Sequence, residues 1–394
     1  MVKGLIGSLI AAAVFFTAGG MTVAIMGTDA NPLKSFEKFG DDFDNLLLDS
    51  DTDGTWYFDN TRKLALGLSS TKAVVKPIEG DQISLSVSSN DASIGIARLS
   101  VRAALNRDGS CLAISVSRGG FFIMDMSSIT TEIGLPKSVY DKLTLSLGSG
   151  SVDAQGLDAL ENEITVGSGK LLFKPSADFT ADSMDLSMGS GIVTAEGVNA
   201  LENAITVGSG KLMFSQSADF TANSMHFSMG SGIAEITSSA AAYLDINIGS
   251  GSLKMDTSKT ERFDIEMGSG KFEVNGLSGS GSIDVSSGIG TARFSDAGGI
   301  NGTELDLSSG KLSVYLPNDT NAQINTDISS GSVDVDCCGV KEKLRSDDEF
   351  VILGKGGAEI DANVSSGKLS ILENDTVISQ ITMTGDAVSG TGNT

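Results

Sequence analysis

The acidic stretch DSDTDGTWYFDN carries the most pointed chemical pattern in the chain. Asp49, Asp51, Asp53 and Gly54 match the D-x-D-x-D-G start of a calcium loop, in which carboxylate oxygens surround a hard cation and glycine makes a sharp turn. Asn60 stands at the twelfth position, where a calcium loop carries a bidentate glutamate, and no second helix follows. The stretch predicts either a weak calcium site or an acidic turn before the first strand, and we favour the turn.

Histidine and cysteine are scarce, with one and three copies, which leaves little material for a His/Cys metal centre or a catalytic triad. His226 corresponds to Asp185 in an internal duplication described below, so we expect a solvent-facing residue and not a catalytic base. Cys337 and Cys338 are adjacent, and Cys111 is far away in the sequence. The open alternatives are a vicinal disulfide, a bridge from one of the pair to Cys111, or free thiols.

Glycine-rich triplets such as GSGK invite comparison with phosphate-binding loops. A P-loop needs the spacing G-x-x-x-x-G-K-[ST] between a strand and a helix, whereas each triplet here separates two strand-like runs. We therefore predict corners and not a nucleotide site. The lysines that follow many triplets are expected to point outward among acidic side chains: Lys170, Lys211, Lys271, Lys311 and Lys368.

The triplets recur along the chain at a nearly fixed interval. Their middle serines, from Ser149 to Ser366, are spaced by 19, 22, 19, 22, 19, 19, 18, 22, 21 and 36 residues. A period of about twenty residues indicates a solenoid of stacked coils. The last spacing is close to two coils, so a longer segment is expected to replace a corner near residues 347–349. Residues 150–189 and 191–230 match at 28 of 40 positions, which indicates a duplicated unit of two coils.

Apolar and polar residues alternate on both sides of each triplet, as in FDIEMGSGKFEV and ELDLSSGKLSV. This period of two is typical of half-buried strands, and stacking the coils would bury the apolar face of each. Similar runs occupy residues 63–68, 73–78, 82–89, 92–101 and 112–117. The predicted fold is all-β, a single-stranded parallel β-solenoid (β-helix) with coils of about 20 residues over residues 60–372.

The third triplet position is glycine in every copy, whereas the first position is serine in the last four copies. The third residue is therefore expected to need either a positive φ or a close backbone approach, both of which glycine allows. The middle serine is small enough to stack on its counterpart one coil away. The predicted corner glycines are Gly150, Gly169, Gly191, Gly210, Gly232, Gly251, Gly270, Gly288, Gly310, Gly331 and Gly367.

The N-terminus carries a targeting signal. Residues 4–27 contain no charge, and at 1.5 Å per residue they would span a hydrocarbon core of about 30 Å. Lys3 favours an orientation with the N-terminus inside, which exports the rest of the chain. The small residues at 17–19 would also suit signal-peptide cleavage. We predict a retained single-pass anchor at 1–30 with an extracellular bulk, or a secreted protein if the segment is cleaved.

Residues 31–59 are predicted to form a linker, with a short helix over 31–49 followed by the acidic turn. Asn31 can cap this helix and Pro32 can occupy its first turn. The helix is expected to form a stalk or to fold over the end of the solenoid. Residues 373–394 form a polar C-terminal tail without a cell-wall sorting motif.

The overall charge excludes several classes of partner. The chain has 27 Lys and Arg against 50 Asp and Glu, a net charge of −23, so its surface repels phosphate backbones and nucleic-acid binding is not expected. Outward acids recur along the strands as on a solvated face, and one Trp and four Tyr give little material for sugar stacking. We therefore predict a protein that is not an enzyme and needs no cofactor, apart from the calcium candidate.

The segment TEIGLPKSVYDKLTLSLGSGSVDA, the repeated h-x-h-x-[GS]-S-G-x-h-x-h units and the closing GKGGAEIDANVSSGKLSIL resemble the bacterial putative-adhesin β-strand repeat family, a domain of uncharacterised function. The resemblance covers about residues 60–372. It implies a parallel β-solenoid at the bacterial cell surface, sometimes attached to membrane anchors or envelope-stress modules, and it supplies no catalytic residues. The chain departs from the family pattern in its regular Gly-Ser-Gly corners, its duplication and its adjacent cysteines.

Two hypotheses for function follow. The first is a membrane-anchored, extracellular, non-catalytic adhesin or structural module that binds a surface protein or glycan. The alternative is an envelope-stress or signalling component that binds a peptide or membrane partner through the solenoid face.

Overall fold

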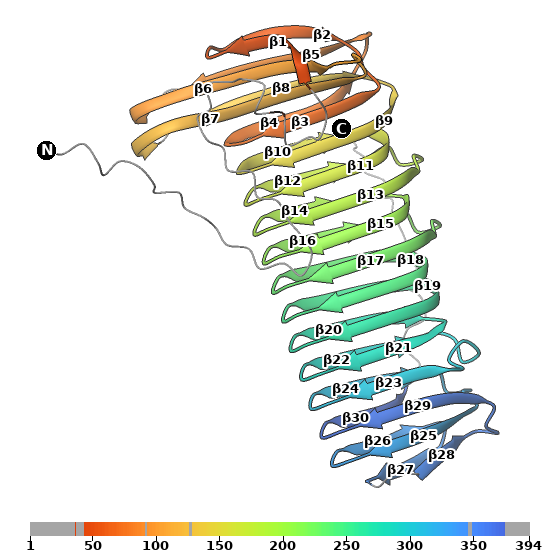
Figure 1. Cartoon of the computed structure of the whole chain (residues 1–394). Helices are drawn as coiled ribbons and strands as arrows, with labels where there is room; N and C mark the ends of the chain where they lie inside the picture. The colour runs from red at the N-terminus through yellow and green to blue at the C-terminus, as the bar shows by residue number, and fades with distance from the viewer. Residues whose placement is uncertain (1–35, 37–42, 91–92, 126–127, 346–348, 375–394) are drawn as a thin grey trace, which may run out of the picture.

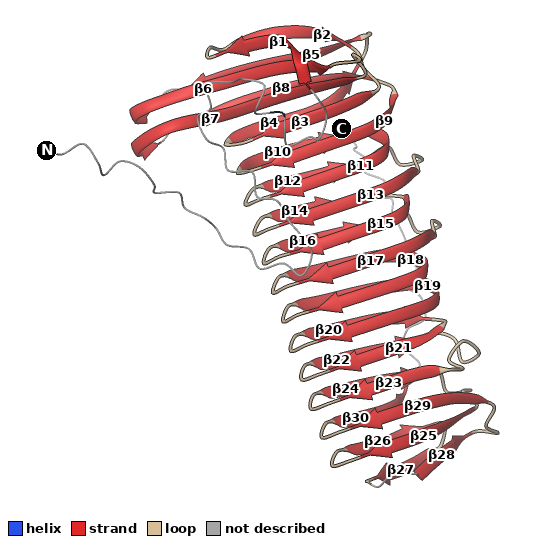
Figure 2. Cartoon of the chain, viewed as in Figure 1, coloured by secondary structure: helices blue, strands red, loops and turns tan. Residues whose placement is uncertain are grey.

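The computed structural model describes residues 36, 43–90, 93–125, 128–345 and 349–374, and it shows an elongated stack of β-strands (Figure 1). The described residues contain no α-helix (Figure 2). No described helix is long and apolar enough to cross a membrane, and the predicted anchor lies outside the described residues. The all-β solenoid predicted from the repeats is confirmed.

Each coil consists of one strand before the triplet and one strand after it, so the stack has two faces. We call them the pre-corner sheet and the post-corner sheet. In stacking order, the pre-corner sheet contains β1 (Phe43–Ser50), β6 (Ser93–Asn106), β7 (Cys111–Asp125), β3 (Lys63–Leu68), β9 (Val139–Leu147), β11 (Asp158–Val166), β13 (Ala181–Met188), β15 (Ala200–Val207), β17 (Ala222–Met229), the second halves of β18 (Ile233–Ile248) and β19 (Ser252–Met267), β21 (Ser280–Val285), β23 (Thr303–Leu307), β29 (Ala358–Val364), β25 (Ala322–Ile328) and β28 (Glu349–Leu353).

The post-corner sheet is the partner layer of the same coils. In stacking order it contains β2 (Gly54–Asp59), β5 (Gln82–Asn90), β8 (Ser128–Pro136), β4 (Thr71–Ile78), β10 (Gly150–Gln155), β12 (Lys170–Lys174), β14 (Ile192–Ala195), β16 (Lys211–Ser215), the first halves of β18 and β19, β20 (Lys271–Leu277), β22 (Ile289–Phe294), β24 (Lys311–Leu316), β30 (Lys368–Glu373), β26 (Ser332–Cys337) and β27 (Val340–Leu344).

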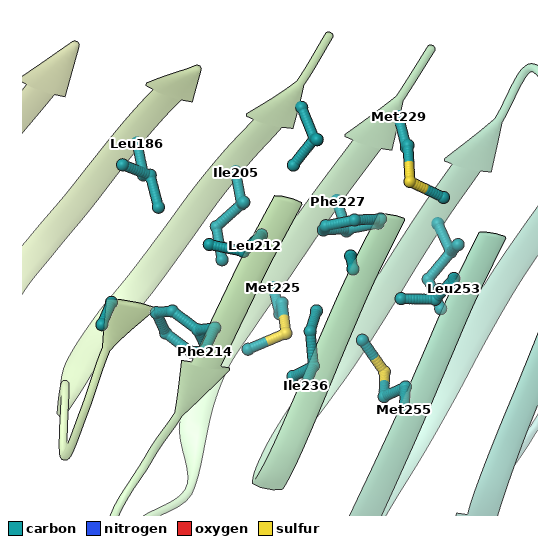
Figure 3. Close-up of a cluster of buried hydrophobic side chains, with 14 of the residues drawn as sticks. Leu186, Ile205, Leu212, Phe214, Met225, Phe227, Met229, Ile236, Leu253 and Met255 are labelled. Atoms are coloured by element: carbon teal, nitrogen blue, oxygen red, sulfur yellow. The ribbon is translucent and has the colours of Figure 1, made fainter. Parts of the chain in front are cut away.

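The main core lies between the two sheets and runs through the stack as one cluster, part of which Figure 3 shows. A second, smaller cluster contains Phe36, Phe43, Ala65, Ala104, Cys111 and Ala113. Inward residues alternate with outward ones as the period of two requires: Leu212 and Phe214 of β16 are buried, and Lys211 and Met213, which alternate with them, are exposed. Each fully buried Leu, Met or Phe contributes about 1.5–3 kcal/mol relative to an exposed position. Because parallel register places every coil directly on its neighbour, one repeated pattern is enough to build the whole core.

The two ends of the stack depart from the all-parallel prediction. At one end β5 and β6 run antiparallel to β8 and β7, and β2 and β1 run antiparallel to β5 and β6 in turn. At the other end β27 and β28 pair antiparallel with β26 and β25. The pairs β6–β7 and β26–β27 are consecutive in the chain and are joined by short turns, which an antiparallel pair allows, whereas a parallel pair needs a full crossover.

The predicted helix over 31–49 is wrong for the part that the structure describes. Residues 43–50 form strand β1, which pairs with β6, and Phe43 packs against Phe36 with ring centroids 5.5 Å apart. Pairing with the edge of β6 stabilises a strand here more than the weak helical spacing of apolar residues stabilises a helix. Residues 31–35 and 37–42 lie outside the described residues.

The long last spacing between triplets has a different cause from the one predicted. The chain builds the coil β25–β26 and the antiparallel strands β27 and β28, and then returns to place β29–β30 between β23–β24 and β25–β26. The other end mirrors this order, with β3–β4 between β7–β8 and β9–β10. At both ends one coil is therefore stacked out of sequence order.

Candidate functional site

The triplet corners form a continuous backbone ladder along one side of the stack. The amide of Ser209 donates to the carbonyl of Gly189, and the amide of Lys211 donates to the carbonyl of Gly191, one coil away. The middle serines also bond along this ladder, with the Oγ atoms of Ser209 and Ser231 3.3 Å apart. Because the amides of the ladder are used between coils, the corners do not form the open nest that phosphate binding requires.

Close approach, and not a positive φ, explains the third glycine of the triplets. Among the predicted corner glycines only Gly150 has a positive φ, of 103°. A Cβ at Gly232 would lie 2.6 Å from the carbonyl oxygen of Gly210, and a Cβ at Gly270 would overlap the carbonyl oxygen of Gly251 in the same way. At the first position a Cβ on Gly268 would lie 2.8 Å from the carbonyl oxygen of Gly249, and serine occupies this position in the last four triplets.

Outward acids form two adjacent rows on the pre-corner sheet, which we call the acidic ladder. One row stacks Glu266, Asp284 and Asp306 on consecutive coils through the pairs Glu266↔Asp284 and Asp284↔Asp306. The next row contains Asp245, Asp264, Ser282, Glu304 and Asp361. Like charges directly opposite each other on neighbouring strands oppose folding, so these positions add nothing to the stability of the stack.

Polar residues donate hydrogen bonds to the acids that surround Asp284, the central residue of the acidic ladder. Ser282 donates to Asp264 at 2.6 Å, Asn363 donates to Asp306 at 2.7 Å, and Asn247 donates to Glu266 at 3.1 Å. Burial, together with the charges of Asp306 and Asp264, raises the pKa of Asp284 above its usual range. The centre of the ladder is therefore a concentrated site of negative potential.

The alternation of residues predicted outward acids but not their alignment between coils. Glu266, Asp284 and Asp306 each stand two residues before the first residue of a triplet. Counting positions back from each corner would have placed the three side chains in one row, because the corners fix the register of the stack.

The post-corner sheet carries a contrasting row of lysines one residue after the corners. The prediction that these lysines point outward is confirmed, since all five are exposed: Lys170, Lys211, Lys271, Lys311 and Lys368. Their partners in register are serine, isoleucine or another lysine and not the acidic side chains that were expected. Beside this row a shallow depression of about 330 Å³ spans β4, β10, β12 and β14, with Lys72, Asp153 and Leu172 in its lining. Its lining also includes Ser151, Lys170 and Thr194 beside apolar side chains.

The three aspartates of the calcium candidate lie at the end of β1 and in the turn to β2. Asp49 Oδ1 accepts a hydrogen bond from Arg102 Nε at 3.1 Å, and Asp53 Oδ1 accepts one from Ser89 Oγ at 2.7 Å. Hydrogen bonding to the backbone and to the hydroxyl of Ser89 lowers the pKa of Asp53. In the part of the chain that the structure describes, no three acidic, His or Cys side chains converge as metal ligands.

The remaining reactive side chains are dispersed. His226 lies on the outer face of β17, and its Nδ1 is 3.0 Å from Asp245 Oδ2. Cys337 and Cys338 bring their sulfur atoms to 3.1 Å at the turn between β26 and β27, whereas buried Cys111 belongs to β7 near the opposite end of the stack. A bridge within one chain from Cys111 to this pair is thereby ruled out, and no disulfide joins Cys337 to Cys338 in this structure.

Comparisons with known proteins identify a family and a solved structure that this chain resembles. The family model described as Toastrack DUF4097 matches residues 61–218 and 204–372. The crystal structure of a putative cell adhesion protein from Clostridium sporogenes is 10% identical, covers 82% of this chain and 100% of its own, and aligns with a TM-score of 0.19. None of the curated proteins matches the chain.

Proposed function

The chain belongs to the Toastrack DUF4097 family, and from this premise we propose that it is a non-catalytic binding or structural module at the cell surface, anchored in the membrane through residues 1–30. The acidic ladder is the observation that carries the proposal. Stacked carboxylates cost folding free energy, so a surface that keeps them adjacent on consecutive coils is best explained by a use outside the fold.

The chemistry of the acidic ladder favours a cationic partner. A flat strip of carboxylates on a chain of net charge −23 attracts basic proteins or glycans with amino groups over a long range and repels anionic surfaces. Such an association is expected to weaken as salt is added, because exposed charges are screened beyond about 8 Å at physiological ionic strength.

Attachment assays test this proposal in cells that lack the protein. We expect deletion to reduce attachment and the full chain to restore it, whereas a chain with Asp264→Asn, Asp284→Asn and Asp306→Asn does not. The matched control replaces three exposed loop aspartates outside the ladder, Asp178→Asn, Asp219→Asn and Asp319→Asn. Full attachment with the ladder variant, or equal loss with the control, would contradict the role of the ladder.

An envelope-stress or signalling role is the second candidate, and the same acidic ladder supports it as a receptor strip for cationic peptides. In that case deletion changes stress-gene expression or tolerance to cationic antibiotics and leaves attachment unchanged. The two measurements on one deletion strain separate the candidates.

A further inference from the structure

Both ends of the stack carry strands that are paired on one side only among the described strands. β27 and β28 pair with β26 and β25, and β2 and β1 pair with β5 and β6 (Figure 1). Each therefore presents a row of backbone amides and carbonyls along its free edge. Such edges are templates for the addition of another strand, and proteins that stay monomeric usually protect them.

The strand directions make the two ends complementary. β28 runs antiparallel to β25 and hence to every parallel strand of the pre-corner sheet. β1 runs antiparallel to β6, which is itself antiparallel to β7, so β1 runs in the common direction. By the same reasoning, β27 and β2 run in opposite directions on the post-corner sheet. A second copy placed along the stack axis would thus meet the first through antiparallel pairs on both sheets.

Exposed apolar side chains lie on the strands that would meet. On β28, Phe350 is 59% and Ile352 is 47% exposed. On β1, Leu46 is 38% and Leu47 is 44% exposed. Burying these residues between copies would contribute about 25 cal/mol for each Å² of apolar surface removed from water.

Charge favours head-to-tail contact over contact between two N-terminal ends or between two C-terminal ends. Residues 43–60 contain five aspartates and no Lys or Arg. Asp44 and Asp49 pair with Arg107 and Arg102 of β6, and the charges of Asp51, Asp53 and Asp59 make two N-terminal ends repel each other. Residues 340–345 contain Lys341, Lys343 and Arg345 against Glu342, a net charge of +2, and two of these cations also form ion pairs within the chain, Lys341 with Asp336 and Lys343 with Asp334 of β26. Two such strands in antiparallel register about Glu342 would place Lys341 opposite Lys343. The basic strand β27 is instead complementary to β2, which Asp53 and Asp59 flank.

We propose that copies of this chain assemble head to tail, with β27 and β28 of one copy adding to β2 and β1 of the next. Both sheets then continue across the junction as one rod. The contact is heterologous, so each added copy leaves a free end of the same kind and the assembly is open. The inference is independent of the acidic ladder, which lies on the side of the stack and remains accessible in such a rod.

Sedimentation velocity of the full chain, in one mild detergent throughout, tests the proposal. We expect a series of species whose mean mass rises with protein concentration. Leu47→Lys and Ile352→Lys each disable one end, and each should abolish every species larger than the monomer. The matched control Ile289→Lys places the same charge at a 52% exposed isoleucine of β22, away from both ends, and should assemble as the wild type does.

Mixing the two end variants gives the sharpest result. An equimolar mixture retains one intact junction, between the C-terminal end of the Leu47→Lys chain and the N-terminal end of the Ile352→Lys chain. It should yield a dimer and nothing larger, which also shows that both variants fold. A wild type that stays monomeric, assembly that survives either single variant, or a mixture without dimer would overturn the proposal. Failure here would leave the attachment results untouched.

Discussion

Asp306 on β23 lies in register with Asn363 on β29, and the Nδ2 atom of Asn363 donates a hydrogen bond to Asp306 Oδ1 at 2.7 Å. The two residues are 57 positions apart, and the chain between them builds β24 to β28. The neighbour of Asp306 in the stack is thus the last coil of the described chain and not the next one in sequence. This out-of-order coil joins the end of the rod to its body.

Removal of the last coil should unfold more than the residues removed. A chain truncated after Gly357 lacks β29 and β30, so β25 and β26 lose their parallel neighbours on the side of β23 and β24. Hydrogen exchange should show loss of amide protection throughout β25 to β28, with protection retained from β9 to β21. Continued protection of β25 and β26 would show that they stack directly on β23 and β24.

The corner ladder should be sensitive at the third glycine. Gly270→Val brings a side chain against the carbonyl oxygen of Gly251, and overpacking of this kind costs about 1–3 kcal/mol of unfolding free energy. Gly268→Ser should cost less, because serine already occupies that position in other coils. The control is Gly298→Val, at a loop glycine whose nearest neighbour to a Cβ is 3.5 Å away. Chemical denaturation of the three variants checks the order; equal costs at all three would contradict the ladder.

The centre of the acidic ladder should make stability depend on pH. The folded-state pKa of Asp284 is raised above its unfolded value, so ionised Asp284 destabilises the fold, and that penalty is relieved as pH falls through the raised pKa. Asp284→Asn should therefore increase the unfolding free energy by about 0.2–1 kcal/mol at pH 7. The gain should vanish below the unfolded pKa of about 3.9.

Thermal unfolding at pH 7 and pH 3 measures this difference. The control is Asp327→Asn, because Asp327 pairs in register with Asn363 and has no carboxylate opposite it on β29. A gain at pH 7 as large for Asp327→Asn as for Asp284→Asn would assign the effect to net charge and not to the ladder.

Calcium should bind weakly or not at all at the acidic turn. The carboxylate of Asp49 accepts a hydrogen bond from Arg102, and a cation would have to displace this arginine before the three aspartates could surround it. Calorimetric titration of the full chain should give no binding heat at millimolar calcium. Heat that disappears in Asp51→Asn and Asp53→Asn variants would instead establish the calcium loop.

The cysteines should differ in reactivity. Cys111 and Cys337 are buried, and burial together with hydrogen bonding to Cys338 raises the pKa of the Cys337 thiol. Cys338 is partly exposed at the turn that follows. A maleimide should label one thiol in the native chain and three after unfolding, as counted by mass spectrometry. Loss of native labelling in Cys338→Ser identifies the residue, whereas labelling of Cys111 before unfolding would contradict its burial.

The sequence by itself determined the structure of a single coil. The alternation of apolar and polar residues and the repeated triplet are local patterns, and they predicted two strands, a glycine corner and a buried face for coils such as β19 to β24. It did not determine the reason for the corner glycine, because the oxygen that excludes a Cβ belongs to the neighbouring coil. The acidic ladder was hidden for the same reason, since only the register between coils makes Asp284 a neighbour of both Glu266 and Asp306.

Only the tertiary structure decided the ends of the stack. Every parallel coil offers the same ladder of backbone groups, so a local pattern does not say which coil stacks on which. The strand β1 shows the same limit, because its sequence is compatible with a helical stripe until the edge of β6 is available. The order of the end coils depends on how the antiparallel strands β5, β6, β27 and β28 cap the core, and these contacts join residues far apart in the chain.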